Sequence, residues 1–280
     1  MTAIEVRAAV PGDRPGIAAV ALANGQGEEW AGADPAYVGH LLAHGTVVVG
    51  VRGGSVVGFG AARTLALGGG PVSMLCDLFV DPAAHGTGCG RALLAALWSA
   101  PGSRMTFSSL HSSALPLYAS FGVDAWWPLL YLQGPVSAVA MPAGWRTVRA
   151  GPAEVSRLEL AWTGADRSAD HPAWARRPGG ASVLAWHGRE VMAAGTVGGA
   201  GEEFGLTHLA MAPAAGAADA VLAVLASLPG QTARVCLPGP HPAVRALLAA
   251  GWRVAEFDLY MATDPGLLDP RRAVPSPALA

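Results

Sequence analysis

The stretch DLFVDPAAHGTGCGRALL, residues 77–94, sets a glycine-rich turn between a strand-like and a helix-like segment. The strand is expected to end at Val80, because Pro82 has no N–H for a sheet ladder. An apolar run from about Arg91 predicts a helix. Three glycines stand on alternate positions between them: Gly86, Gly88 and Gly90. Backbone N–H groups that no Cβ covers, together with the start of a helix, predict an anion site suited to a pyrophosphate.

Two common phosphate-binding turns do not fit this stretch. All 18 basic residues are arginines, so the lysine of the GxxxxGK[ST] loop is missing, and Schiff-base chemistry is excluded with it. The dinucleotide fingerprint GxGxxG is followed by an acidic residue about 20 positions later. Here no Asp or Glu occurs between Asp81 and Asp124.

The stretch resembles the acetyl-CoA motif of the GNAT N-acetyltransferase superfamily. That motif is a strand with Val-x-Pro, then [Arg/Gln]-x-x-Gly-x-[Gly/Ala] and an apolar helix. Gly88 and Gly90 match it, whereas His85 stands where the family has Arg or Gln. A second block, HSSALPLYASFGV at 111–123, resembles the family's Asn-x-x-Ala-x-x-x-Tyr-x-x-x-Gly-Phe. The resemblance covers residues 4–133, and residues 145–263 in strand and helix order only.

The resemblance implies acetyl-CoA as co-substrate and an amine that attacks its thioester directly. A backbone N–H at Phe79 or Val80 would stabilise the carbonyl oxygen, and Tyr118 would protonate the departing thiolate. The residues implied to bind the cofactor are Phe79, Val80, His85, Gly86, Thr87, Gly88, Cys89, Gly90, Arg91 and His111.

The base that removes a proton from the attacking ammonium has several candidates. Asp77, in the strand before the turn, is the first by position, and His111 is a further one. Glu28 and Glu29, in NGQGEEW, could instead hold a cationic acceptor. Cys89 is interpreted as a small filler rather than a nucleophile. No metal is expected, because the three cysteines lack the paired spacing of a zinc site.

The sequence repeats itself in order. The segment DLFVDPAAHG at 77–86 resembles HLAMAPAAGA at 208–217. The segment SALPLYASFGV at 113–123 resembles PAVRALLAAGW at 242–252. An ordered set of such pairs indicates an internal duplication. The fold class expected is α/β of the α+β layer type, with two tandem GNAT-like domains, each a mixed, mostly antiparallel sheet flanked by helices. The predicted divisions are 1–133, a linker at 134–144, 145–263 and a flexible tail at 264–280.

The second repeat is expected to have lost the chemistry. Aligned on the proline, Gly88 falls on Asp219 and Gly90 on Val221, while Tyr118 falls on Leu247. A carboxylate would then repel a pyrophosphate. The second repeat could complete the acceptor cleft, cover apolar surface or form a homodimer. Its polar segment GADRSADHPAW is either a substrate-binding or a solvated loop, with candidate contacts at Asp166, Arg167, Asp170 and His171.

Composition limits the partners. A formal net charge of -2 leaves no basic field for nucleic acid or an anionic membrane. No export signal or membrane span is recognised, so a cytoplasmic protein is expected, and the lysine-free composition suggests a bacterial source. The function expected is acetyl-CoA-dependent N-acetylation of a small-molecule amine. The alternatives are a non-catalytic acyl-CoA-binding sensor or scaffold, and O- or acyl-chain transfer on the same fold.

Overall fold

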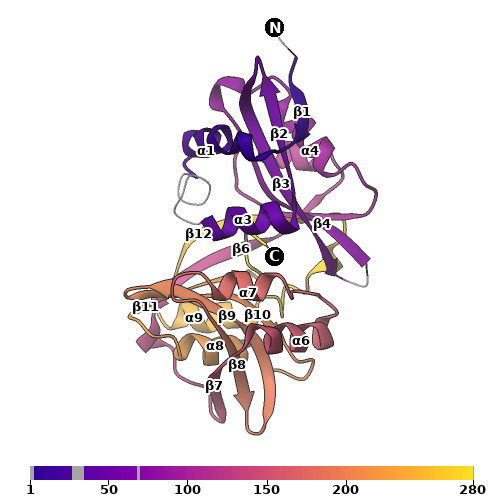
Figure 1. Cartoon of the computed structure of the whole chain (residues 1–280). Helices are drawn as coiled ribbons and strands as arrows, with labels where there is room; N and C mark the ends of the chain where they lie inside the picture. The colour runs from indigo at the N-terminus through magenta and orange to yellow at the C-terminus, as the bar shows by residue number, and fades with distance from the viewer. Residues whose placement is uncertain (1–2, 27–34, 68–69, 280) are drawn as a thin grey trace. The chain divides into compact units, whose positions relative to one another are not determined.

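The computed structural model describes residues 3–26, 35–67 and 70–279 (Figure 1). The chain divides into two compact units. The first comprises Met1–Leu65 and Pro71–Thr106, and the second comprises Ala66–Gly70 and Phe107–Ala280. This border lies earlier than the one drawn from the repeats, because the last part of the first repeat belongs to the second unit.

The first unit is built on strands in the order β1-β2-β3-β4-β5, with β1, β2 and β3 antiparallel and β4 parallel to β5. Its helices follow the expected order, although α4 begins two residues before Arg91. The elements are β1 (Glu5–Ala8), α1 (Arg14–Ala23), α3 (Pro35–His44), β2 (Thr46–Arg52), β3 (Ser55–Leu67), β4 (Gly70–Val80), η2 (Pro82–Ala84), α4 (Cys89–Leu97) and β5 (Ser103–Ser108).

Helix α4 packs closely on β2 and β3 because both strands carry glycines beneath it. A Cβ at Gly50 or at Gly58 would lie 2.9 Å from the Cys89 sulfur. Neighbouring residues of a strand face opposite sides of the sheet, and Phe59 accordingly meets the Phe79 ring, with centroids 5.5 Å apart. Asp77 is on the same face as Phe79 and contacts Tyr37 of α3. The sheet of the first unit is therefore covered on both faces.

The second unit is built on strands in the order β12-β6-β11-β10-β9-β8-β7. Strands β10 and β11 run parallel, and the other pairs are antiparallel. The elements are α5 (Ala114–Ala119), β6 (Asp124–Pro135), β7 (Trp145–Ala150), α6 (Pro152–Thr163), α7 (Asp170–Ala175), β8 (Ala181–His187), β9 (Glu190–Ala200), β10 (Glu203–Met211), α8 (Ala217–Ala226), β11 (Thr232–Pro238), α9 (Pro242–Ala249) and β12 (Arg253–Ala262).

Strand β6 ends the first repeat in sequence, yet it lies between two strands of the second repeat. It pairs with β11 along 129–135 and with β12 along 124–133. The close fit requires a glycine, since a Cβ at Gly134 would lie 2.4 Å from the Trp252 ring. The segment EFDLYMA, residues 256–262, forms most of β12.

The main core of the second unit lies between its sheet and helices α8 and α9. Val221, Val224 and Leu247 are fully or almost fully buried there. On the opposite face, Val155 of α6 packs against Leu184 and Ala194. Leu184 and Ala194 neighbour in sequence the core residues Ala185 and Ala193, as the alternation of side chains along a strand requires.

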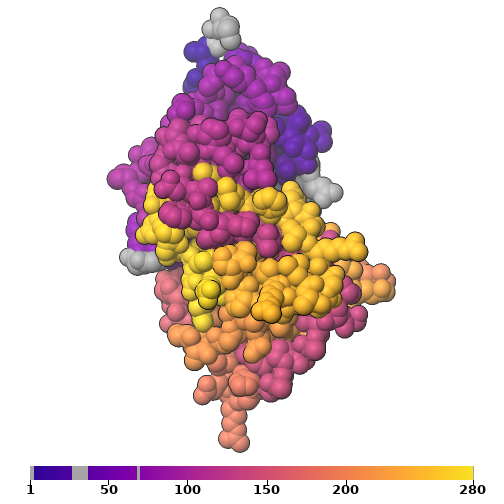
Figure 2. All heavy atoms as spheres, turned by 180° about the vertical axis from the view of Figure 1, so that it is seen from behind, coloured from indigo at the N-terminus to yellow at the C-terminus, as the bar shows by residue number. Residues whose placement is uncertain are grey.

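The prediction of a flexible tail at 264–280 is wrong. Val274 and Leu279 are 1% exposed, and Leu209 N–H donates to Val274 O at 3.2 Å. Arg272 donates to the carbonyls of Ala212 at 2.6 Å and Ala215 at 3.2 Å. The tail has no periodic pattern, but its few apolar side chains and one arginine anchor it to the second unit. In Figure 2, the yellow surface of the last part of the chain borders the orange surface of the same unit.

None of the helices in the described part of the chain is long and apolar enough to cross a bilayer.

Candidate active site

The glycine turn between β4 and α4 has the backbone geometry that only glycine adopts readily. Gly86 has a φ of 74° and Gly88 a φ of 85°, both in the left-handed region. A Cβ at either position would have no atom within 4 Å, so the space beside the turn is open. The first bond within α4 runs from Ala92 N–H to Gly88 O. The earlier N–H groups of the helix therefore point out of its N-terminus, where an anion binds.

Side chains of the turn itself hold this backbone in place. The Asp81 carboxylate accepts from Ala83 N–H at 2.8 Å and caps η2. The Thr87 hydroxyl donates to Ala84 O at 2.6 Å. Thr87, predicted as a cofactor residue, thus uses its hydroxyl within the loop and offers its backbone N–H.

The end of β4 is fixed by two side chains. The Val80 carbonyl accepts from Asn24 Nδ2 at 3.1 Å and from His85 Nε2 at 3.0 Å. Asn24, which follows α1, also donates to Val20 O at 2.8 Å. His85, which stands where the family has Arg or Gln, therefore holds the end of β4 in place through this hydrogen bond. The sequence analysis did not identify Asn24 as a site residue. The feature that could have indicated it is its position at the C-terminal end of α1.

Cys89 and Arg91 occupy different environments at the start of α4. Cys89 is 1% exposed, and burial raises the pKa of its thiol, which makes a reactive thiolate unfavourable. This packing agrees with the interpretation of Cys89 as a small space-filling residue. The group that Cys89 offers to a cofactor is therefore its backbone N–H rather than its thiol. Arg91 is exposed in the first turn of the helix.

Asp77 lies in a buried polar pair that the sequence analysis did not anticipate. Its side chain is on β4, three residues or about 10 Å before Val80. The Tyr37 hydroxyl donates to Asp77 Oδ2 at 2.5 Å, and Tyr37 is 2% exposed. One turn further along α3, His40 accepts from the buried Arg63 guanidinium. The signal was present in YVGHLLAH, where Tyr37 and His40 stand three residues apart, on one face of a helix.

Tyr118 and His111 are two further predicted site residues. Tyr118 is buried on α5, and His111 is exposed, with its Nδ1 2.9 Å from Ser113 Oγ. Both belong to the second unit, whereas the turn and Asp77 belong to the first. Their roles remain predictions. Glu28 and Glu29 lie outside the described residues.

The corresponding junction of the second repeat lacks the turn. Helix α8 begins at Ala217, and its N-cap Gly216 has an ordinary φ of -68°. Aligned on the helix starts, Asp219 corresponds to Arg91 rather than to Gly88, which corrects the alignment on the proline. The Asp219 carboxylate reaches back to the helix start, since a Cβ at Gly216 would lie 3.4 Å from Asp219 Oδ2.

The polar segment of the second repeat is not a solvated substrate loop. Asp166 is exposed, but three of the predicted contacts are almost fully buried: Arg167, Asp170 and His171. Arg167 donates to Asp170 Oδ2 at 3.1 Å and to Leu279 O at 2.8 Å. His171 lies 2.6 Å from Glu159 Oε2. These side chains therefore bind one another and the tail.

Together, the mixed sheet covered by helices and the open glycine turn before α4 define an α/β protein whose turn has the backbone geometry of an anion-binding site. Residues 43–123 match the family model of the acetyltransferase (GNAT) domain. The first repeat therefore contains a GNAT domain, which confirms the resemblance drawn from its motifs. No curated protein matches the sequence.

Solved structures extend the fold to the whole chain. A protein of Pyrococcus horikoshii assigned as an acetyltransferase is 15% identical, with a TM-score of 0.71 over 99% of this chain and 94% of that one. A tandem GNAT protein from the clavulanic acid biosynthesis pathway is 16% identical, with a TM-score of 0.64 over 95% and 100%. A GCN5-related N-acetyltransferase from Kribbella flavida is 17% identical, with a TM-score of 0.63 over 93% and 71%. The chain therefore has the tandem GNAT fold.

Proposed function

We propose that this chain is an acetyl-CoA-dependent N-acetyltransferase that acts on a small-molecule amine. The observation that carries the proposal is the turn with left-handed Gly86 and Gly88 at the open N-terminus of α4. Such a turn offers backbone N–H groups to the pyrophosphate of acetyl-CoA. The GNAT domain match at 43–123 supports acetyl transfer as the reaction class.

In the proposed reaction, the amine nitrogen attacks the thioester carbon, forming a C–N bond while the C–S bond breaks. Asp77 takes the proton of the attacking ammonium, and Tyr37 holds the carboxylate through the bond at 2.5 Å. The backbone at Phe79 and Val80 stabilises the carbonyl oxygen, and Tyr118 supplies a proton to the thiolate. The bonds of Asn24 and His85 to Val80 O fix this strand end.

The second repeat, in this proposal, does not bind acetyl-CoA. Its shortened junction has no left-handed glycine before α8, and the Asp219 carboxylate lies at the helix start. The tail also lies along the strand end, with Val274 O bound to Leu209 N–H and Arg272 bound to the carbonyls of Ala212 and Ala215. The corresponding strand end of the first repeat is the end of β4, which leads into the proposed cofactor turn.

Calorimetric titration of the full chain with acetyl-CoA tests the proposal. We expect one site per chain, followed by release of free thiol when a panel of small amines is added. Two sites would contradict the account of the second repeat. No binding would overturn the transferase assignment, and binding without thiol release over the amine panel would favour the acyl-CoA sensor.

A further inference from the structure

The second unit contains a buried polar cluster that the proposed acetyl transfer does not use. Glu159 of α6 lies between His171 of α7 and His208 of β10. Its Oε2 is 2.6 Å from His171 Nε2, and its Oε1 is 2.8 Å from His208 Nε2. One donor atom from each of the three residues lies within 4.8 Å of the others. None of the three is more than 7% exposed.

An arginine lies beside the cluster. The Arg167 guanidinium is 4.0 Å from Glu159 Oε1 and 3.1 Å from Asp170 Oδ2.

The surroundings hold the imidazoles in fixed orientations. His171 Nδ1 lies 2.9 Å from Thr196 Oγ1, the kind of bond that orients metal-binding histidines. The Trp174 ring is stacked on His208 and stands edge-on to His171, with centroids 5.1 and 5.2 Å away. The two imidazoles thus reach Glu159 with limited freedom to turn away.

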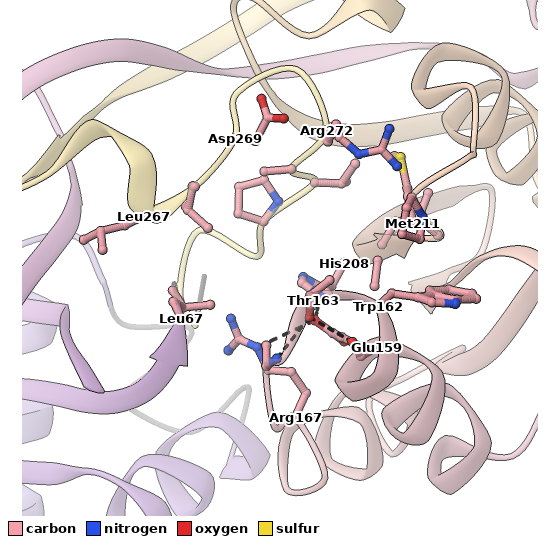
Figure 3. A pocket seen from close by; sticks show the side chains of 18 residues that line it. Leu67, Glu159, Trp162, Thr163, Arg167, His208, Met211, Leu267, Asp269 and Arg272 are labelled. Atoms are coloured by element: carbon pink, nitrogen blue, oxygen red, sulfur yellow. Dashed lines mark hydrogen bonds and ion pairs between the residues drawn. The ribbon is translucent and has the colours of Figure 1, made fainter. Parts of the chain in front are cut away.

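One side of the cluster opens on a cavity of about 350 Å³ (Figure 3). Glu159 and His208 line it, together with apolar side chains such as Trp162, Met211 and Leu267. Within the described residues, His208 Nδ1 has no hydrogen-bond partner. A water or small ligand in the cavity can reach the cluster from this side.

We propose that Glu159, His171 and His208 form a divalent-metal site of the zinc type, with a coordination position open to the cavity. Two imidazoles and one carboxylate are a common ligand set of zinc sites that keep an open position. Zinc bonds of about 2.0–2.2 Å separate tetrahedral donors by roughly 3.4 Å, so ligation lengthens the two contacts of Glu159 with the histidines, now 2.6 and 2.8 Å, by about 0.6–0.8 Å. The bound ion would join α6, α7 and β10.

The site was not visible in the sequence because its ligands are far apart. Glu159 and His171 come from two helices, and His208 comes 37 positions after His171. The expectation of no metal rested on cysteine spacing, which does not bear on this ligand set.

Titration of the chelator-treated full chain with Zn²⁺, and separately with Co²⁺, tests the proposal without any activity assay. We expect one Zn²⁺ per chain with a Kd below about 1 µM, a visible Co²⁺ spectrum of low coordination number and a higher Tm with metal. A chain that takes up no metal would overturn the site.

The variants His171→Ala, His208→Ala and Glu159→Gln are each expected to weaken Zn²⁺ binding at least 100-fold. His187→Ala, an exposed histidine of β8, is the matched control and should leave Kd unchanged. Circular dichroism checks that each variant folds. If a variant does not fold, the zinc-edge anomalous signal in wild-type crystals decides, because a peak away from the three side chains would contradict the proposal.

Discussion

The two strand-to-helix junctions of this chain differ in length and in what fills them. In the first, eight residues (81–88) separate β4 from α4, and two of them are left-handed glycines. In the second, five residues (212–216) separate β10 from α8. The three residues that are missing correspond to the glycine turn. A helix start alone is common to both junctions, so the turn is what distinguishes the candidate site.

A second difference concerns the strand before each junction. Asp77 and His208 are aligned by the repeat, and both are buried and bonded to a side chain of a neighbouring helix. In the first repeat the partner is Tyr37; in the second it is Glu159, with His171 added. The duplicated position has kept its burial and its polarity while its chemistry has changed from a carboxylate to an imidazole.

The largest expected effect tests the role of Asp77. Asp77→Asn should lower turnover roughly 10²–10⁴-fold, as loss of a general base does, and leave acetyl-CoA affinity unchanged. Thiol release and calorimetry measure the two quantities. Glu190→Gln, an exposed carboxylate of β9, is the control and should have wild-type turnover. Turnover above half of wild type in Asp77→Asn would show that another group takes the proton.

Gly88→Asp gives the first turn the kind of carboxylate that stands at the second junction. A non-glycine residue in the left-handed region costs about 1–2 kcal/mol, so the turn of the free variant relaxes away from the binding geometry, and binding must restore that strain. Repulsion of the pyrophosphate adds about 1 kcal/mol. Acetyl-CoA affinity should therefore fall at least about 30-fold. The matched change Gly216→Ala, at a φ of -68°, should not alter it. Equal losses in both variants would mean that the second junction also contributes to binding.

Arg272→Ala tests whether the tail is anchored as described. It removes the donors to the carbonyls of Ala212 and Ala215, and loss of hydrogen bonds from a charged group costs about 2 kcal/mol. Calorimetric unfolding should show a Tm lower by several degrees, with the number of acetyl-CoA sites still one. Arg271→Ala, the exposed neighbour, serves as control. A second cofactor site in Arg272→Ala would show that the tail alone closes the second junction.

The smallest expected effect concerns an ion pair of the first repeat. Arg7 binds both oxygens of Asp13, at 2.7 and 2.8 Å, and this contact lowers the pKa of Asp13 to about 2.

A carboxyl with a lowered pKa stabilises the folded state above the pKa of the unfolded chain, near 4, and this stabilisation is lost as the pH falls toward 2. Asp13→Asn should therefore be less stable than wild type at pH 7, with a difference that shrinks between pH 4 and pH 2. Denaturant unfolding at these pH values measures it. A difference that does not change with pH would assign the effect to packing.

Much of the first unit was predictable because its signals are local. Proline and glycine punctuation around 82–90 predicted the junction, and apolar periodicity predicted the helices. The helix start at Cys89 was missed because Gly90 was assigned to the turn. Glycine is a poor helix former, but in the first turn the bare backbone suits a close ligand.

The polar clusters were not predictable because their members meet only after folding. Tyr37 and Asp77 are 40 positions apart, and Glu159 and His208 are 49 apart. The prediction of a flexible tail failed for a related reason. Its anchors are single residues, Arg272, Val274 and Leu279, whose partners are backbone groups and side chains elsewhere in the second unit.

The place of β6 between β11 and β12 has an evolutionary consequence. A gene cut after the first copy would encode a strand whose two hydrogen-bonding neighbours are no longer synthesised. Deletion of the second repeat would therefore leave both edges of β6 unpaired, so the two repeats are expected to be inherited together.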